Sequence, residues 1–412
     1  MGDKKRTLRP KRWFVWIVKP LILGFLRKRY RITIIENEKV KEISPPFIMV
    51  GNHVSFWDPF FLHMDITPTV QYITSDNIFR TFLLGTVMRI LGSIPTSKFM
   101  SDIGTIAQVL RVIKNRGVIG VFPEGRRTWD GSKLAHVPTV SKLIHRLRLP
   151  VIGVIIKGGY LSNPRWGRHI RPGKVELEYK LIFTPEELKG ISVEEAHRLM
   201  EERLYHDDME WQRRNMIPFV GKAPAEYIEK ALFVCPNCKS IKTIHSKDDI
   251  GTCTSCGYSF RYNRFGFLEA LSGPLVFNTV SDWNRWQLEY YEKFLVEKID
   301  TREVLLEEGR SILLQGYRTK PLRKINTGRA MITPEGVAFQ TTIGKKIFFP
   351  IREILGENVQ NGEKLEFYHS NSLFRLDFVN VRESAFMWYQ TIFLLHKILR
   401  DREQQAEGRI NA

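Results

Sequence analysis

The stretch PFIMVGNHVSFWDP, residues 46–59, places a short apolar run directly before a histidine and an aspartate. The stretch GVIGVFPEG, residues 117–125, has the same pattern, because its apolar run also leads into a polar loop. A third apolar run covers residues 149–158, and residues 83–91 and 103–115 have helical spacing of apolar side chains. Strands that alternate with helices predict an α/β domain with a largely parallel sheet.

The polar residues after the first strand suit general base catalysis. Asp58 and Pro59 precede the apolar run FFLHM, which predicts a helix with Asp58 near its N-cap and Pro59 at its first position. His53 would then lie in the loop before this helix, where the carboxylate accepts one ring N–H and leaves the other nitrogen as a proton acceptor. A capping aspartate beside a packed histidine, with no catalytic role, is the alternative.

The loop after the second strand, FPEGRRTWDG at residues 122–131, joins a carboxylate to two adjacent arginines. Backbone N–H groups and guanidinium groups in such a loop are suited to an anionic ligand. Glu124 would repel an anion, so we expect it to anchor an arginine or to accept hydrogen bonds from substrate hydroxyls. Ligands of parallel sheets bind at the carboxyl ends of the strands, where both loops are expected.

These motifs together resemble the glycerolipid acyltransferase family, which includes 1-acylglycerol-3-phosphate and glycerol-3-phosphate acyltransferases. The family is marked by Asn-His-x-x-x-x-Asp and Phe-Pro-Glu-Gly-x-Arg, and a further block has Gly-x-x-Pro ahead of a basic residue. The matching residues here are Asn52, His53, Asp58, Gly92, Pro95, Lys98, Phe122, Pro123, Glu124, Gly125 and Arg127. The resemblance covers about residues 31–215.

The sequence differs from the family pattern in three places. Lys98 stands where arginine is common, which keeps the charge but loses a bidentate phosphate contact. Arg126 replaces the usual threonine, and Pro138-Thr139 fall where a glycine is usual. The last difference leaves the selectivity for the acceptor open.

The resemblance implies acyl transfer from a thioester of coenzyme A or acyl carrier protein to a hydroxyl of a lysophospholipid, foremost 1-acylglycerol-3-phosphate. It implies that His53 removes the hydroxyl proton and that Asp58 orients His53. The acceptor's phosphate would be held by Lys98, Glu124, Gly125 and Arg127. A glycerol-3-phosphate acyltransferase and a non-enzymatic lipid-binding adaptor are the alternatives.

Residues 1–30 form a basic, aromatic arm, because residues 1–31 contribute +10 of the formal net charge of +19. Its apolar run, residues 13–26, is shorter than the about 20 residues that a membrane span requires. We therefore expect an interfacial helix and a peripheral or monotopic protein at the cytoplasmic face of a membrane. A core helix with a basic flank is the alternative, and no small-residue signal-peptide cleavage site follows Leu26.

All four cysteines lie in two Cys-x-x-Cys pairs, formed by Cys235 with Cys238 and by Cys253 with Cys256. Four thiolates complete a tetrahedral shell, so this spacing predicts a zinc ribbon whose metal is structural. Disulfides are the alternative. A basic chain with a zinc ribbon also suggests nucleic-acid binding as a function. We do not expect this function, because nearby aspartates offset the charge of the lysines in this segment.

The last segment shows an aromatic helical stripe at residues 281–295, several strand-like runs and a final helix at 384–399. This order predicts a β-rich domain similar to pleckstrin-homology-like domains, with a lipid or a protein as its partner. One long helix is expected over residues 192–214, with Ser192 and Glu195 as its capping box.

The chain is therefore expected to consist of four parts: a membrane arm at 1–30, an acyltransferase domain at 31–220, a zinc ribbon at 221–270 and the β-rich domain at 271–412.

Overall fold

The computed structural model describes residues 9–35, 38–97 and 103–410. The chain divides into two compact units. The first, called the α/β unit, comprises Met1–Arg165, His169–Pro224 and Arg264–Gly266. The second, called the C-terminal unit, comprises Trp166–Arg168, Ala225–Asn263 and Phe267–Ala412.

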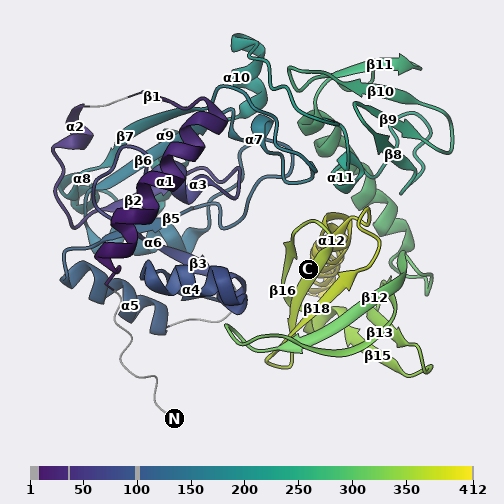
Figure 1. Ribbon diagram of the computed structural model, residues 1–412. Helices are drawn as coiled ribbons and strands as arrows, with labels where there is room; N and C mark the ends of the chain where they lie inside the picture. Colours follow the sequence, from purple (N-terminus) through teal and green to yellow (C-terminus); the bar gives the residue numbers. More distant parts are fainter. Residues whose placement is uncertain (1–8, 36–37, 98–102, 411–412) are drawn as a thin grey trace. The chain divides into compact units, whose positions relative to one another are not determined.

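The α/β unit is built on a seven-stranded sheet with the strand order β1-β7-β6-β2-β5-β3-β4 (Figure 1). Its strands are β1 (Thr33–Ile35), β2 (Ile48–Gly51), β3 (Val70–Ser75), β4 (Ile94–Thr96), β5 (Val118–Val121), β6 (Val151–Lys157) and β7 (Glu176–Phe183). All neighbouring strands are parallel except β6 and β7, which are antiparallel. The largely parallel sheet predicted from the sequence is confirmed.

Helices surround this sheet. They are α1 (Arg12–Tyr30), α2 (Glu38–Lys41), α3 (Asp58–Leu62), α4 (Phe82–Ile90), α5 (Ile103–Lys114), α6 (Pro138–Leu147), α7 (Gly159–Ser162), α8 (Pro185–Gly190), α9 (Val193–Arg203) and α10 (Asp208–Asn215), with a 3₁₀ helix, η1, at Asp76–Arg80. Residues of α5, α6, α8 and α9 share the core on one face of the sheet, and α1 crosses the other face (Figure 1). Burial on both faces explains why β2 and β5 are apolar throughout.

The expectation of a single long helix over residues 192–214 is wrong. Ser192 caps α9 by accepting the N–H of Glu195 at 3.1 Å, but α9 ends at Arg203. Asp207 starts α10 by accepting two backbone N–H groups, and the buried Asp208 carboxylate accepts the N–H groups of Gly158 and Tyr160. The helix breaks because these carboxylates bind backbone donors that a continuous helix would place elsewhere.

Helix α1 contains the apolar run of the arm. Five large side chains at helical spacing are exposed and form what we call the apolar face of α1: Trp13, Trp16, Ile17, Leu21 and Phe25. Lys19 interrupts the run in sequence but not on this face, because its Nζ turns inward and donates to the carbonyl of Ile66 at 2.6 Å. Across the residues that the structure describes, no helix has the length and apolar character needed to span a membrane.

The C-terminal unit begins with a small antiparallel sheet of order β11-β10-β9-β8. Its strands are β8 (Ile244–Lys247), β9 (Ile250–Cys253), β10 (Ser259–Tyr262) and β11 (Leu268–Ser272), preceded by a 3₁₀ helix, η2, at Ile228–Lys230. Helix α11 (Val280–Lys298) follows, and Thr279 caps it by accepting the N–H of Asp282.

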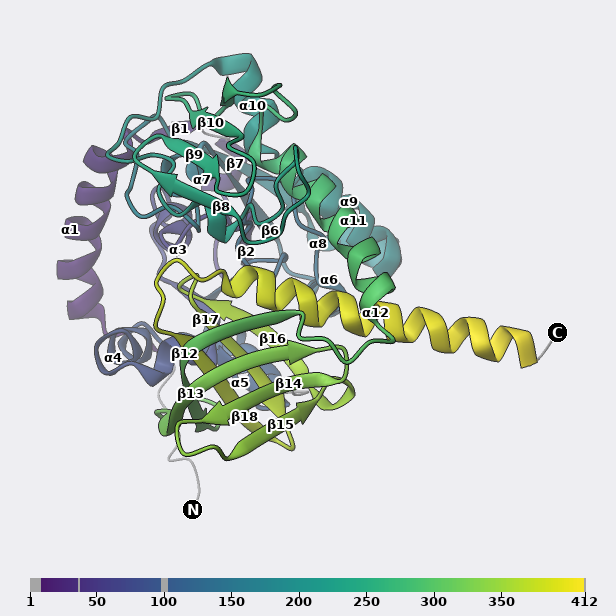
Figure 2. The same cartoon turned by 90° about the vertical axis from the view of Figure 1, so that its right-hand side faces the viewer.

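The rest of this unit is a bent antiparallel sheet of order β15-β14-β13-β12-β18-β17-β16 (Figure 2). Its strands are β12 (Leu306–Gly316), β13 (Arg323–Thr333), β14 (Gly336–Thr341), β15 (Lys346–Pro350), β16 (Leu355–Gln360), β17 (Lys364–His369) and β18 (Ser372–Phe378), with a 3₁₀ helix, η3, at Ile351–Glu353. Strands β13 and β16 contain many polar residues, so apolar alternation along their own sequences is weak.

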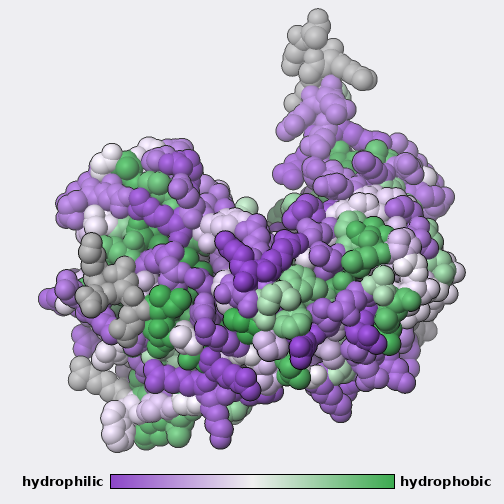
Figure 3. Space-filling view, turned by 90° about the horizontal axis from the view of Figure 1, so that it is seen from above, coloured by the Kyte–Doolittle hydropathy of each residue, from purple (hydrophilic) through white to green (hydrophobic). Residues whose placement is uncertain are grey.

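Helix α12 (Ala385–Ile410) packs against β16 and β17 and is longer than the helix expected at 384–399. Its last turns are hydrophilic and project from the unit (Figure 3). Apolar periodicity cannot predict this extension of the helix. Residues with high helix propensity, such as Arg, Glu and Gln, extend the helix although no apolar face packs there.

Candidate active site

His53 and Asp58 form a hydrogen-bonded pair at the carboxyl end of β2. The distance from His53 Nδ1 to Asp58 Oδ2 is 2.7 Å, and the carboxylate is fully buried while the imidazole is 21% exposed. The carboxylate thus binds the proton on Nδ1, and the proton-accepting nitrogen of that tautomer is Nε2. This is the arrangement of a general base with its orienting acid.

Backbone donors hold the Asp58 carboxylate in place. It accepts the N–H of Val54 at 2.7 Å, the N–H of Ser55 at 2.9 and 3.0 Å, and the Ser55 hydroxyl at 2.7 Å. Asp58 is the first residue of α3 and Trp57 occupies the cap position, so the helix starts one residue earlier than expected. The chain curls back around the carboxylate because the loop supplies these N–H groups within four residues.

The His53 ring is also fixed by stacking. Its face lies on the Phe122 ring with centroids 4.2 Å apart and an angle of 14° between the planes. Tyr72 stacks on Phe122 with centroids 6.0 Å apart, and its hydroxyl donates to the carbonyl of Pro59 at 2.7 Å. The rings of Phe122 and Tyr72, from two other segments, therefore set the orientation of the imidazole.

The loop of residues 122–131, which we call the Pro-Glu-Gly loop, contacts His53 directly. The backbone N–H of His53 donates to Glu124 Oε2 at 3.3 Å, and the carbonyl of His53 accepts the N–H of Thr128 at 3.0 Å. Glu124 is buried, and this burial raises the pKa of its carboxyl well above the ordinary value. A carboxyl with so high a pKa is neutral over a wider pH range, which weakens the repulsion that a carboxylate would exert on an anionic ligand.

Gly125 and Arg127 follow in the same loop. Gly125 is exposed and has φ of +66°, a conformation that glycine adopts without strain. Burial lowers the pKa of Arg127, and within residues 9–35, 38–97 and 103–410 its guanidinium has no hydrogen-bond partner. A partly desolvated cation of this kind gains stability from an anion.

Of the block that contains Gly92, Pro95 and Lys98, the structure describes only the first two residues. The carbonyl of Gly92 accepts the Gln71 side-chain amide at 3.1 Å, and Pro95 lies in β4 beside β3. Lys98, the predicted phosphate contact, lies outside the described residues. The structure therefore brings His53, Asp58, Glu124 and the backbone of Thr128 together.

The apolar face of α1 reaches the loop that carries His53. The Phe25 ring lies 6.3 Å from the Trp57 ring, and Phe56, in the same loop, is 43% exposed. Trp57 is the cap residue of α3, next to Asp58. An exposed apolar surface thus ends beside the histidine–aspartate pair.

Several residues that support the site were not predicted to do so. Ser55 was not among the predicted site residues, although its spacing of three from Asp58 is a signal for a side-chain hydrogen bond. Tyr72 lies on another strand, and no local signal links it to His53. Asn52 was recognised in its motif, and its amide bonds both backbone groups of Ile156, at 2.8 and 2.9 Å, which ties β2 to β6.

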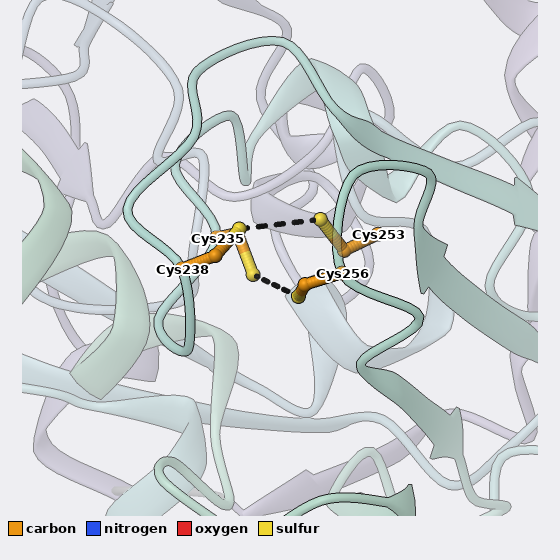
Figure 4. A group of neighbouring side chains, drawn as sticks. All are labelled: Cys235, Cys238, Cys253 and Cys256. Atoms are coloured by element: carbon orange, nitrogen blue, oxygen red, sulfur yellow. Dashed lines mark hydrogen bonds between the residues drawn. The ribbon is translucent and has the colours of Figure 1, made fainter.

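The second cluster consists of the four cysteines. Their side chains point toward one another from two loops (Figure 4), and all four sulfur atoms lie within 4.8 Å of one another. The sulfur atoms of Cys235 and Cys256 are 3.8 Å apart, and those of Cys238 and Cys253 are 3.7 Å apart. These distances exceed the about 2.05 Å of a disulfide bond, so the disulfide alternative does not fit.

The cluster fits a zinc ion. With Zn–S bonds of about 2.3 Å, two sulfur atoms of a tetrahedral shell are about 3.8 Å apart, which matches the observed separations. Neighbouring groups donate toward the sulfurs: the Asn237 amide contacts Cys256 Sγ at 3.4 Å and lowers the pKa of that thiol. The Thr243 hydroxyl lies 3.2 Å from Cys253 Sγ. Four clustered cysteines with such outer contacts suit a structural zinc.

Residues 31–157 match the family model described as Acyltransferase. A search of solved structures finds the 1-acyl-sn-glycerophosphate (LPA) acyltransferase PlsC from Thermotoga maritima, with 22% sequence identity and a TM-score of 0.39. That alignment covers 48% of this chain and 81% of the PlsC chain. No curated protein matches this chain.

Proposed function

We propose that this protein transfers an acyl group from an acyl thioester to the free hydroxyl of a lysophospholipid, with 1-acylglycerol-3-phosphate as the acceptor and phosphatidic acid as the product. The thioester carrier is coenzyme A or acyl carrier protein. One observation carries the proposal: in a domain that matches the acyltransferase family, the His53–Asp58 pair directly contacts the Pro-Glu-Gly loop through Glu124.

In this reaction His53 acts as the base. Its Nε2 removes the proton of the acceptor hydroxyl while that oxygen attacks the thioester carbonyl carbon. The new C–O bond forms, the tetrahedral intermediate collapses, and the C–S bond breaks. The imidazolium returns its proton to the leaving thiolate, and the buried Asp58 carboxylate stabilises the imidazolium between these steps.

The Pro-Glu-Gly loop binds the acceptor. Arg127, as a partly desolvated cation, holds the phosphate with Gly125 and Lys98. Glu124 takes part as a neutral carboxyl, because its raised pKa allows it to donate a hydrogen bond to an acceptor oxygen. This role removes the conflict between a carboxylate and an anionic substrate.

The lysophospholipid is favoured over glycerol 3-phosphate by the exposed apolar face of α1. That face ends at Trp57, next to Asp58, so a bilayer in contact with α1 would present a lipid acceptor close to His53. We assign the arm, residues 1–30, to peripheral binding at the cytoplasmic face of a membrane.

For the remainder of the chain we propose a structural zinc in a ribbon at residues 221–270 and a pleckstrin-homology-like domain at 271–412. The strand order β15-β14-β13-β12-β18-β17-β16 with a closing helix supports the second assignment by fold analogy. A lipid or protein partner is proposed for this domain. The catalytic domain is assigned to residues 31–220.

The test is a transfer assay with labelled acyl-CoA, in which 1-acylglycerol-3-phosphate and glycerol 3-phosphate are offered separately. We expect turnover of the lysophospholipid and a loss of about 10²–10⁴-fold in His53→Ala. His169→Ala serves as the matched control, because His169 lies in the loop before β7, and it should keep full activity.

Preference for glycerol 3-phosphate would show the alternative acceptor to be correct. No turnover of either acceptor by the folded wild-type protein, with both thioester carriers, would favour the lipid-binding adaptor. Full turnover by His53→Ala would remove His53 as the base.

A further inference from the structure

A groove of about 1,060 Å³ lies between α1 and the sheet, at the end opposite to the candidate active site. Its wall includes Thr69 and Val118, at the amino ends of β3 and β5, whereas His53 follows the carboxyl end of the parallel strand β2. Its volume is at the upper limit of the about 300–1,000 Å³ typical of ligand pockets. We call it the α1 groove.

Among the residues that the structure describes, three cations and no carboxylate line the α1 groove. Arg9 donates to the side-chain oxygen of Asn115 at 3.2 Å, Lys19 donates to the carbonyls of Ile66 and Thr67, and Arg116 donates to the carbonyl of Pro45 at 3.3 Å. All these acceptors are neutral. In the described part of the chain, none of the three cations forms an ion pair with a carboxylate.

Burial lowers the pKa of Lys19, which shows that its positive charge is partly desolvated where it lines the groove. A charge in that position is stabilised by an anion placed beside it. Helix α1 also begins here without an acidic residue in its first turn and without a side-chain cap. As far as residues 9–35, 38–97 and 103–410 are concerned, the groove is therefore electropositive and has no internal counter-charge.

The rest of the lining is apolar and includes Val15, Trp16 and Leu21. Trp16 and Leu21 also belong to the apolar face of α1, where they are 80% and 70% exposed, so the groove opens onto that face. An apolar wall beside a cationic one suits an amphiphile with an anionic head and a hydrocarbon chain. It does not suit inorganic phosphate or a nucleic acid, which leave the apolar wall uncovered.

We propose that the α1 groove is a binding site for an anionic phospholipid of the bilayer, separate from the acceptor site. Arg9, Lys19 and Arg116 bind the headgroup phosphate, and the side chains of α1 cover the upper part of one acyl chain. The site ties α1 to the membrane lipid and, because Phe25 of α1 contacts Trp57, holds the catalytic loop at the surface. It does not depend on the proposed acyl transfer.

The test is calorimetric titration of the full chain, without acyl donor, with dihexanoyl phosphatidylglycerol below its micelle concentration. This lipid is neither the proposed acceptor nor the proposed product. We expect one saturable site and about tenfold or greater weakening in Arg9→Gln/Arg116→Gln. The double variant keeps Lys19 and its contacts with the carbonyls of Ile66 and Thr67. An unchanged thermal unfolding temperature would verify that the variant is folded.

The matched control is Lys28→Gln/Lys114→Gln, which removes two exposed cations of α1 and α5 that do not line the groove. It should weaken binding less than twofold, as should Arg127→Gln in the candidate active site. Dihexanoyl phosphatidylcholine and inorganic phosphate should bind at least tenfold more weakly.

The proposal is overturned if the control pair loses as much affinity as the groove pair, or if phosphatidylcholine or inorganic phosphate binds equally well. Loss of binding in Arg127→Gln alone would place the lipid in the acceptor site instead. None of these results bears on whether His53→Ala abolishes transfer, so the two proposals fail separately.

Discussion

The corner formed by His53 and Asp58 is built from one loop and the four-cysteine cluster from two, and different forces hold them. The Asp58 carboxylate is bound by the N–H groups of Val54 and Ser55 and by the Ser55 hydroxyl. The four thiols contact mainly one another, at 3.7 and 3.8 Å. As thiolates they would repel, so that cluster needs a cation and the corner does not.

Because different forces hold the two sites, each site should be sensitive to a different kind of change. A site held by main-chain hydrogen bonds keeps its geometry when no substrate is bound, whereas a metal site is coupled to the folding of its ligands. Changes in the corner should therefore reduce the reaction rate, and changes in the cluster should reduce the stability of the C-terminal unit.

The largest effect is expected from removal of the metal. Purified protein should contain about one zinc per chain, and Cys253→Ser should lose it, because three sulfurs do not complete the shell. Structural zinc contributes about 10–16 kcal/mol in zinc-finger peptides, so the ribbon should unfold at a markedly lower temperature. Metal analysis and thermal unfolding measure the zinc content and the stability.

Ser255→Ala is the control. Ser255 lies between Cys253 and Cys256, and the variant should keep the zinc. A zinc-free Cys253→Ser that unfolds like the wild type would contradict the comparison.

The next effect is expected from Asp58→Asn. An amide in this position turns an N–H group toward backbone donors and binds the wrong tautomer of His53, so we expect about 10²–10⁴-fold slower transfer. The measurement is kcat per folded molecule, with zinc content unchanged.

Asp208→Asn is the matched control, because Asp208 is equally buried and also binds a histidine, His206, at 2.6 Å. It should lose stability, by about 1–3 kcal/mol, without a specific loss of kcat. Equal kcat losses in both variants would mean that Asp58 acts only through the fold.

The smallest effect is a pH dependence that comes from Glu124. Because burial raises the pKa of its carboxyl above the value in the unfolded chain, its contribution to stability is complete in acid and is lost as the pH rises toward the raised pKa. The free energy of unfolding should therefore fall with pH above about 4.5, and Glu124→Gln should flatten this slope. Denaturant titrations at several pH values measure the free energy of unfolding.

Glu194→Gln is the control. Glu194 is exposed on α9, and the variant should leave the slope unchanged. A slope that persists in Glu124→Gln would show that groups other than Glu124 cause it.

Local signals predicted the sites better than they predicted the ends of the elements. The spacing of five between His53 and Asp58 placed the pair correctly, because one loop spans it. The helix expected over 192–214 was wrong at Leu204, where the break depends on Asp208 reaching Gly158, a contact across 50 residues. Polar strands such as β13 and β16 depend more on pairing with their neighbours in the sheet than on their own sequence pattern.

By itself, the sequence determined the alternation of strands and helices, the histidine–aspartate pair and the two cysteine pairs, because each of these depends on residues a few positions apart. Tertiary structure alone decided that Glu124 is buried beside the His53 backbone, that Tyr72 and Phe122 orient the imidazole, and that Arg9, Lys19 and Arg116 share one groove. These properties arise from burial and from contacts between distant segments. A local pattern does not encode the solvent exposure of a charge, and that exposure sets both its pKa and its need for a partner.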